Sequence, residues 1–165
     1  MGVMSKGGNM GDSVERVIAL LDQIKAIPQA MVVIAGSRGS GKTRVAKLLA
    51  EKGLGTYLSL SLALSRHRMT GDSDHDVAWP SDFIASLVSS VSLDSTLILD
   101  NIEAVFQPEL QLNPLGWLLK MAREIPLVVV WPGPVLDGEF VFSMPNRPDY
   151  FRQREQSVIV VNLGA

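Results

Sequence analysis

The chain has 165 residues, the usual size of one domain, and its 47% hydrophobic and 19% charged residues exclude a disordered tail. The formal net charge of -2 excludes a general positive field for non-specific nucleic-acid binding. Cysteine is absent, which excludes disulfides, thiolate catalysis and cysteine-ligated zinc, and suits a reducing compartment. We expect no membrane-spanning helix, because no apolar run reaches the roughly 18 residues that such a helix requires and prolines interrupt the best one, residues 125–136.

The first third of the chain predicts a lead-in, a helix and a strand. Residues 1–11 hold four glycines and no periodic apolar pattern, so we expect a flexible lead-in followed by one domain over residues 12–165. Asp12 with Glu15 three residues later is typical of a helix start, and apolar residues at helical spacing follow as far as Pro28. The apolar run Met31–Ala35 predicts a strand buried on both faces.

The rest of the chain alternates predicted helices and strands. A glycine-rich loop precedes a helix over 42–52. We then expect strands over 56–62, 97–99, 127–131 and 158–163, helices over 83–91 and 115–124, a loop over 69–80 and a hairpin arm over 140–142. This alternation predicts a three-layer α/β sandwich of five mainly parallel strands, with the 31–35 strand central.

One motif carries the strongest chemical signal. Residues 36–43 read Gly-Ser-Arg-Gly-Ser-Gly-Lys-Thr and fit G-x-x-x-x-G-K-[ST] at every fixed position, between a predicted strand and a predicted helix. Such a P-loop wraps backbone N–H groups around a phosphate, while Lys42 reaches the outer phosphates and the Thr43 hydroxyl ligates Mg²⁺. The alternative is an ordinary glycine-rich turn. The expected nucleotide-binding residues are Gly36, Ser37, Arg38, Gly39, Ser40, Gly41, Lys42, Thr43 and Arg44.

A P-loop also needs an acidic group near the metal. The apolar strand over 97–99 delivers Asp100 at its carboxyl end, where ligands of α/β sheets gather, so we expect Asp100 to hold Mg²⁺ with Thr43. The alternative is that Asp100 caps a helix. Asn101 can orient a water molecule but cannot accept its proton, so the nearest candidate base is Glu103. Glu103 could equally occupy a helix N-terminus or solvent.

Three arginines cluster before the last predicted strand. Arg147 and Arg152 are candidates for an arginine finger, and Arg154, nearer the strand, is a weaker one. The alternative is that all three are solvated surface residues.

Several segments in order resemble the BrxF family, the small P-loop proteins of type 3 BREX (bacteriophage exclusion) systems. They are Leu97–Glu103, Phe106, Pro108–Leu110, Asn113–Leu115, Val130–Gly133, Pro148–Tyr150 and Val158–Leu163. The resemblance implies a cytoplasmic ATPase-like component of a multi-protein anti-phage system, working beside larger BREX proteins that discriminate host from phage DNA. Whether the chain itself touches DNA stays open.

More broadly, the chain is similar to the nucleotide-binding core of AAA+ ATPases, which implies the strand order 5-1-4-3-2. It departs from that pattern in three places. Asn101 stands where a catalytic Glu usually follows the Asp, Trp131 stands near the position of a polar sensor, and no helical lid is expected after Ala165. We therefore expect slow hydrolysis, completed by self-association or by partners.

Three functions compete at this point. The first is a slow ATPase with ATP and Mg²⁺ as cofactors, the second is an ATP-dependent assembly module without turnover, and the third is a small-molecule or nucleotide kinase. No acceptor-binding motif supports the kinase. The absence of an Asn-Lys-x-Asp segment favours ATP over GTP.

Overall fold

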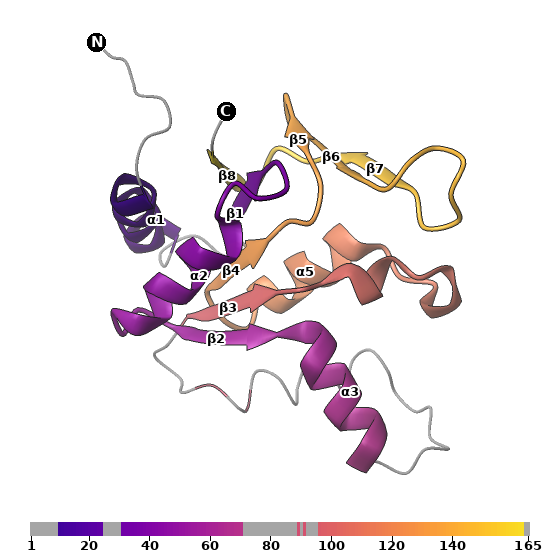
Figure 1. The fold of residues 1–165 in the computed structure, drawn as a ribbon, viewed down its shortest axis with the longest axis horizontal. Helices are drawn as coiled ribbons and strands as arrows, with labels where there is room; N and C mark the ends of the chain where they lie inside the picture. Colours follow the sequence, from indigo (N-terminus) through magenta and orange to yellow (C-terminus); the bar gives the residue numbers. More distant parts are fainter. Residues whose placement is uncertain (1–9, 25–30, 71–88, 90, 92–95, 164–165) are drawn as a thin grey trace.

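The computed structural model describes residues 10–24, 31–70, 89, 91 and 96–163 (Figure 1). Its main sheet has five strands, all parallel: β1 (Met31–Gly36), β2 (Thr56–Ser59), β3 (Leu97–Asp100), β4 (Leu127–Val130) and β8 (Ile159–Leu163). They lie in the order β2-β3-β4-β1-β8. Read from β8 and numbered along the chain, this is the order 5-1-4-3-2, so the predicted parallel P-loop topology is confirmed; β1 is an interior strand, but the middle one is β4.

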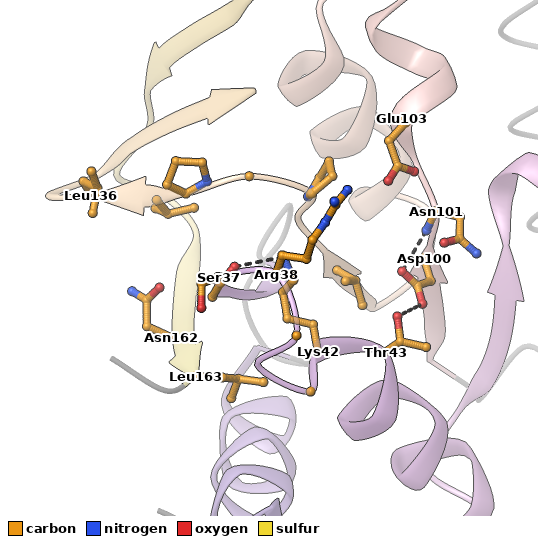
Figure 2. A pocket seen from close by; sticks show the side chains of 18 residues that line it. Ser37, Arg38, Lys42, Thr43, Asp100, Asn101, Glu103, Leu136, Asn162 and Leu163 are labelled. Atoms are coloured by element: carbon orange, nitrogen blue, oxygen red, sulfur yellow. Dashed lines mark hydrogen bonds between the residues drawn. The ribbon is translucent and has the colours of Figure 1, made fainter. Parts of the chain in front are cut away.

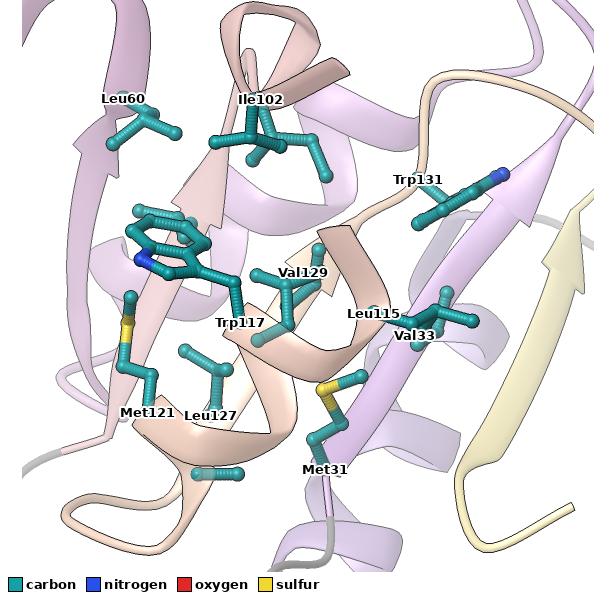
Figure 3. Close-up of a cluster of buried hydrophobic side chains, with 14 of the residues drawn as sticks. Met31, Val33, Leu60, Ile102, Leu115, Trp117, Met121, Leu127, Val129 and Trp131 are labelled. Atoms are coloured by element: carbon teal, nitrogen blue, oxygen red, sulfur yellow. The ribbon is translucent and has the colours of Figure 1, made fainter. Parts of the chain in front are cut away.

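Helices cover both faces of this sheet, which explains the unbroken apolar strands. Met31 and Val33 belong to the cluster under α5 (Pro114–Ala122), which Figure 3 shows around Trp117 and Met121. The alternate residues of β1 face α1 (Met10–Ile24) and α2 (Lys42–Glu51). Every residue from 31 to 35 is therefore buried, as a strand between two helical layers requires.

The predicted strand over 56–62 is too long. β2 ends at Ser59, and α3 (Leu60–Thr70), which the sequence did not predict, begins at the next residue. Leu60 and Leu64 are 0% and 6% exposed while Leu62 is 50% exposed, which is the spacing of a helix rather than of a strand. Residues 69 and 70 of the predicted loop also belong to α3, and the rest of that loop lies outside the described residues.

A second, antiparallel sheet stands beside the first. It comprises β5 (Val135–Leu136), β6 (Glu139–Phe142) and β7 (Phe151–Arg154), in the order β5-β6-β7. The expected hairpin arm over 140–142 is confirmed. Asp137 and Gly138 have φ angles of 52° and 82°, the left-handed pair that a two-residue hairpin turn needs. β7 was not predicted.

Aromatic side chains pack the small sheet against the main core. Phe106, in the 3₁₀ helix η1 (Glu103–Phe106), stacks on Phe142 at 4.1 Å between ring centroids. Trp131 meets Phe106 and Phe140 edge to face, at 5.3 and 5.1 Å. A second 3₁₀ turn, η2 (Pro108–Leu110), leads on to α5. The two sheets thus share one hydrophobic core.

The remaining boundaries differ little from expectation. α1 begins at residue 10, so residues 10 and 11 of the expected lead-in are helical, and residues 1–9 lie outside the described part. α5 ends two residues before the predicted end, and most of the helix expected over 83–91 is likewise outside the described part. Within the described ranges, none of the helices combines the length and apolarity needed to cross a membrane.

Candidate functional site

The loop between β1 and α2 has the shape that its glycines permit. Gly41 precedes the helix with φ 99°, and within the described chain no side chain caps the first N–H groups of α2. A Cβ on Gly36 would lie 2.5 Å from Ser40 Oγ and 2.9 Å from the Leu163 carbonyl oxygen, so only glycine fits there. Ser40 Oγ is buried, and the described part of the chain offers it no hydrogen-bond partner.

Lys42 folds back over this loop. Its Nζ donates to the carbonyl oxygens of Gly36 at 2.9 Å and Trp131 at 3.1 Å. Burial lowers the pKa of Lys42 below 10.5, while the carboxylates of Asp100 and Glu103 act in the opposite direction. Two carbonyl dipoles therefore hold the ammonium group at the mouth of the phosphate loop.

Asp100 is the centre of a dense hydrogen-bond network. Asp100 is the last residue of β3, and only 3% of its surface is exposed. Oδ2 accepts hydrogen bonds from Thr43 Oγ1 at 2.7 Å and from the Tyr57 hydroxyl at 2.8 Å, and Oδ1 accepts one from the Asn101 backbone N–H at 2.8 Å. Burial, together with this carboxylate, raises the pKa of Tyr57 well above its usual range. The interpretation of Asp100 as a helix cap is wrong, because η1 starts after Ile102 without a side-chain cap.

The two residues considered for water activation lie beside Asp100. Asn101 adopts a left-handed φ of 54° and donates from Nδ2 to Ser59 Oγ at 2.8 Å. Glu103 is exposed and is the first residue of η1, so it lies both at a short helix start and on the cleft. The structure thus brings Asn101 and Glu103 to the cleft, and the catalytic role of Glu103 stays a prediction.

These residues surround an open cleft of about 1040 Å³. One wall is the phosphate loop, a second is the end of β3, and a third is formed by the segment Pro132–Leu136 with the end of β8. Figure 2 shows Thr43, Asp100 and Glu103 towards one end and Leu136 with Asn162 towards the other. Of the predicted nucleotide-binding residues, Ser40 and Arg44 are not among those lining the cleft.

The predicted arginines stand outside this cleft. Arg152 lies on β7 and forms an ion pair with Glu139 at 2.7 Å, and Arg154 Nη1 donates to the Asp137 carbonyl oxygen at 2.6 Å. The Glu139 partner raises the pKa of Arg152, and Arg152 lowers that of Glu139. Arg147 is exposed in the turn between β6 and β7. The segment is therefore partly a strand: Arg152 and Arg154 lie on the small sheet, and Arg147 lies in the turn before β7.

Sequence reasoning missed Tyr57, Ser59 and the third wall of the cleft. Tyr57 and Ser59 reach Asp100 and Asn101 because β2 pairs with β3 in register, Ser59 beside Asp100. The available signals were the tyrosine and the serine of the predicted strand 56–62, which comes before the strand that ends at Asp100. The wall over 132–136 had only one signal, the Asp137-Gly138 turn.

The donor set fits a magnesium nucleotide. Mg²⁺ in such sites is held by one or two carboxylates and by substrate phosphates, with water completing the shell. Thr43 Oγ1 and the Asp100 carboxylate lie 2.7 Å apart at the carboxyl end of β3, and these two groups would hold the ion. Among the described residues, no group of three or more His, Asp or Glu side chains forms a separate metal site.

Comparisons with known proteins give weak likenesses. No protein-family model and no curated protein matches the sequence. A structure of Drosophila ORC bound to DNA has 15% sequence identity and a TM-score of 0.45, and the match covers 93% of this chain and 45% of that one. A structure of C. elegans PCH-2 has 18% identity and a TM-score of 0.42, with coverage of 93% and 42%. The chain spans less than half the length of these two proteins.

Proposed function

We propose that this protein binds ATP with Mg²⁺ and hydrolyses it slowly. The observation that carries the proposal is the joint placement of Lys42 and the Thr43–Asp100 pair around one open cleft, with the start of α2 facing the same space. A helix N-terminus, an ammonium group and a hydroxyl–carboxylate pair are together what a triphosphate with a divalent ion requires.

Each group has a distinct task in this proposal. Lys42 neutralises the outer phosphates, the loop N–H groups wrap the inner ones, and Thr43 and Asp100 position Mg²⁺ and its water. The ion withdraws charge from the phosphates when it is bound. Glu103 is the only carboxylate besides Asp100 that lines the described cleft, so it is the candidate that orients or deprotonates the attacking water.

Hydrolysis by the isolated chain should be slow. Asn101 cannot take a proton, and its side chain is already bonded to Ser59. No arginine of the cluster over 147–154 lines the described cleft, so a finger from this cluster would have to act on the cleft of a second copy. Such fingers contribute roughly 10³–10⁵ in turnover where they occur. We propose nucleotide-dependent self-association or partner docking as the step that completes the site.

The biological setting of the proposal rests on the sequence resemblance. The segments from Leu97 to Leu163 that resemble the BrxF family support a role as an ATPase component of an anti-phage system, in the cytoplasm beside other BREX proteins. The test is phage exclusion in cells that carry a complete system of this type. Replacing Lys42 with Ala should abolish exclusion at unchanged protein level, and unchanged exclusion would contradict the role.

The alternative function is an ATP-dependent assembly module without turnover, which the bonded Asn101 side chain favours. Calorimetry of ATP binding with and without Mg²⁺ tests the shared part of both proposals. Phosphate release measured over a hundred-fold range of protein concentration then separates them. Turnover that rises with concentration supports the ATPase, whereas nucleotide-dependent association with no phosphate release supports the assembly module. Failure to bind ATP overturns both.

A further inference from the structure

The Asp100 carboxylate has an unusual third partner, the hydroxyl of Tyr57. β2 runs parallel to β3 with Tyr57 beside Ile98, so a long side chain at position 57 on that face extends towards the carboxylate two residues further along β3. The ring packs against the α2 side of the sheet, and Lys47 Nζ lies 5.5 Å from its centroid. The hydroxyl is thereby held 2.8 Å from Asp100 Oδ2.

This hydrogen bond restricts how Asp100 can act on a metal ion. A carboxylate offers about four lone-pair positions on its two oxygens. Within the described part of the chain, Thr43 and Tyr57 occupy both positions of Oδ2, and the Asn101 N–H occupies one of Oδ1. A single position therefore remains, on Oδ1. An ion or its water that approaches Asp100 finds one acceptor site in one direction.

We infer that Tyr57 is a positioning residue that fixes Asp100 for Mg²⁺ and against larger cations, an inference that rests on the proposed function. Mg²⁺ demands a near-ideal octahedral shell, whereas Ca²⁺ accepts variable coordination and longer contacts. One fixed acceptor site therefore favours Mg²⁺. Without the hydroxyl, Oδ2 regains a free position, the carboxylate can rotate, and the preference for Mg²⁺ falls.

The experiment measures ATP affinity by calorimetry in EDTA, in Mg²⁺ and in Ca²⁺ for wild type and Tyr57→Phe. The ring of Phe retains the packing and only the hydroxyl is lost. We expect metal-free affinity to stay within about twofold, and the gain in affinity from Mg²⁺ to fall roughly tenfold, the lower end of the range known for outer-shell partners of metal sites. The gain from Ca²⁺ should change less.

Two further variants keep the result interpretable. Tyr150→Phe removes the hydroxyl of the chain's other tyrosine, which does not line the cleft, and should match wild type in all three conditions. In an Asp100→Ala background, Tyr57→Phe should have no additional effect on the Mg²⁺ gain, because its target is gone. If the role of Tyr57 were only structural, Tyr57→Phe would lower the metal-free affinity for ATP both in the wild-type and in the Asp100→Ala background.

The outcomes separate this inference from the proposed function. If wild type fails to bind ATP in any condition, the proposed function is wrong. If wild type shows a Mg²⁺ gain and Tyr57→Phe shows the same gain and the same ratio between Mg²⁺ and Ca²⁺, only the role of Tyr57 is wrong. Should Tyr57→Phe unfold, Tyr57→Met, which also lacks the hydroxyl and keeps a long apolar side chain, takes its place, and an unchanged ratio between the Mg²⁺ and Ca²⁺ gains overturns the inference.

Discussion

Replacing Lys42 with Ala should separate nucleotide binding from folding. The side chain is partly buried and donates two hydrogen bonds to backbone carbonyls, at 2.9 and 3.1 Å. Gly36 lines the cleft and Trp131 lies between two residues that line it, so water can hydrogen-bond to both carbonyl oxygens after the substitution. Burial already lowers the pKa of Lys42, which means that the folded protein holds the charge at a cost. The lost bonds and the relieved desolvation oppose each other, and the free energy of unfolding should change by less than about 1 kcal/mol.

The effect on ATP binding should be much larger. An ammonium group about 4 Å from one phosphate charge gains about 4 kcal/mol at the effective dielectric constant of a protein surface, which is an upper bound for one such pair. Each 1.4 kcal/mol is about tenfold in affinity, so the substitution should weaken ATP·Mg²⁺ binding by roughly a hundredfold to a thousandfold.

Calorimetry and urea unfolding on the same preparations measure the two effects. A variant that is as stable as wild type and binds ATP·Mg²⁺ a hundredfold more weakly agrees with the reasoning. ATP affinity within threefold of wild type would refute the placement of phosphates beside Lys42. A loss of several kcal/mol in unfolding free energy would refute the solvent-replacement argument.

Four other outcomes are expected. Asp100→Ala should abolish the gain in ATP affinity from Mg²⁺ and leave binding in EDTA nearly unchanged, as judged by calorimetry. Trp131→Phe loses the Nε1–H bond to the Val141 carbonyl oxygen (3.0 Å) and should cost about 1–3 kcal/mol in urea unfolding at unchanged ATP affinity. The folded-state pKa of Lys42 lies below 10.5, so the ammonium group loses its proton as pH rises through that lowered value, and ATP affinity should fall on the alkaline side. If Lys42→Ala shows the same decline, deprotonation of Lys42 is not its cause. Arg147→Ala should reduce concentration-dependent phosphate release more than Arg152→Ala does, because Arg152 forms an ion pair with Glu139. If both variants match wild type over a hundred-fold dilution, this segment contains no arginine finger.

The parts of the site that are contiguous in sequence could be predicted from it. The phosphate loop, the strand before it and the helix after it occupy adjacent residues, so their spatial relation follows from the peptide chain itself. Asp100 needed one further step, that apolar parallel strands end at the same edge of a sheet. Tyr57 and Ser59 needed the register between β2 and β3, and no local pattern contains that information.

The error at β2 has a local physical cause. Residues 59–64 alternate serine with leucine, then alanine with leucine, and thus imitate the period of a half-buried strand. The same leucines at positions 60 and 64 also stand four residues apart, on one side of a helix. Tertiary packing decides between the two patterns, and here it buries Leu60 and Leu64 and exposes Leu62. Periodicity in a short segment cannot distinguish these alternatives.

Trp131 shows how the structure uses a position where the AAA+ resemblance implies a polar sensor. Its indole is fully buried against Phe106 and Phe140 and donates to the Val141 carbonyl oxygen on the small sheet. Its backbone N–H donates to the Ile34 carbonyl oxygen of β1, and its own carbonyl accepts from Lys42. One residue thus joins the core, the small sheet and the cation of the phosphate loop. In the proposed complex with ATP, a Lys42 that turned towards the phosphates would release the carbonyl of the residue that packs against the small sheet, on which Arg152 lies.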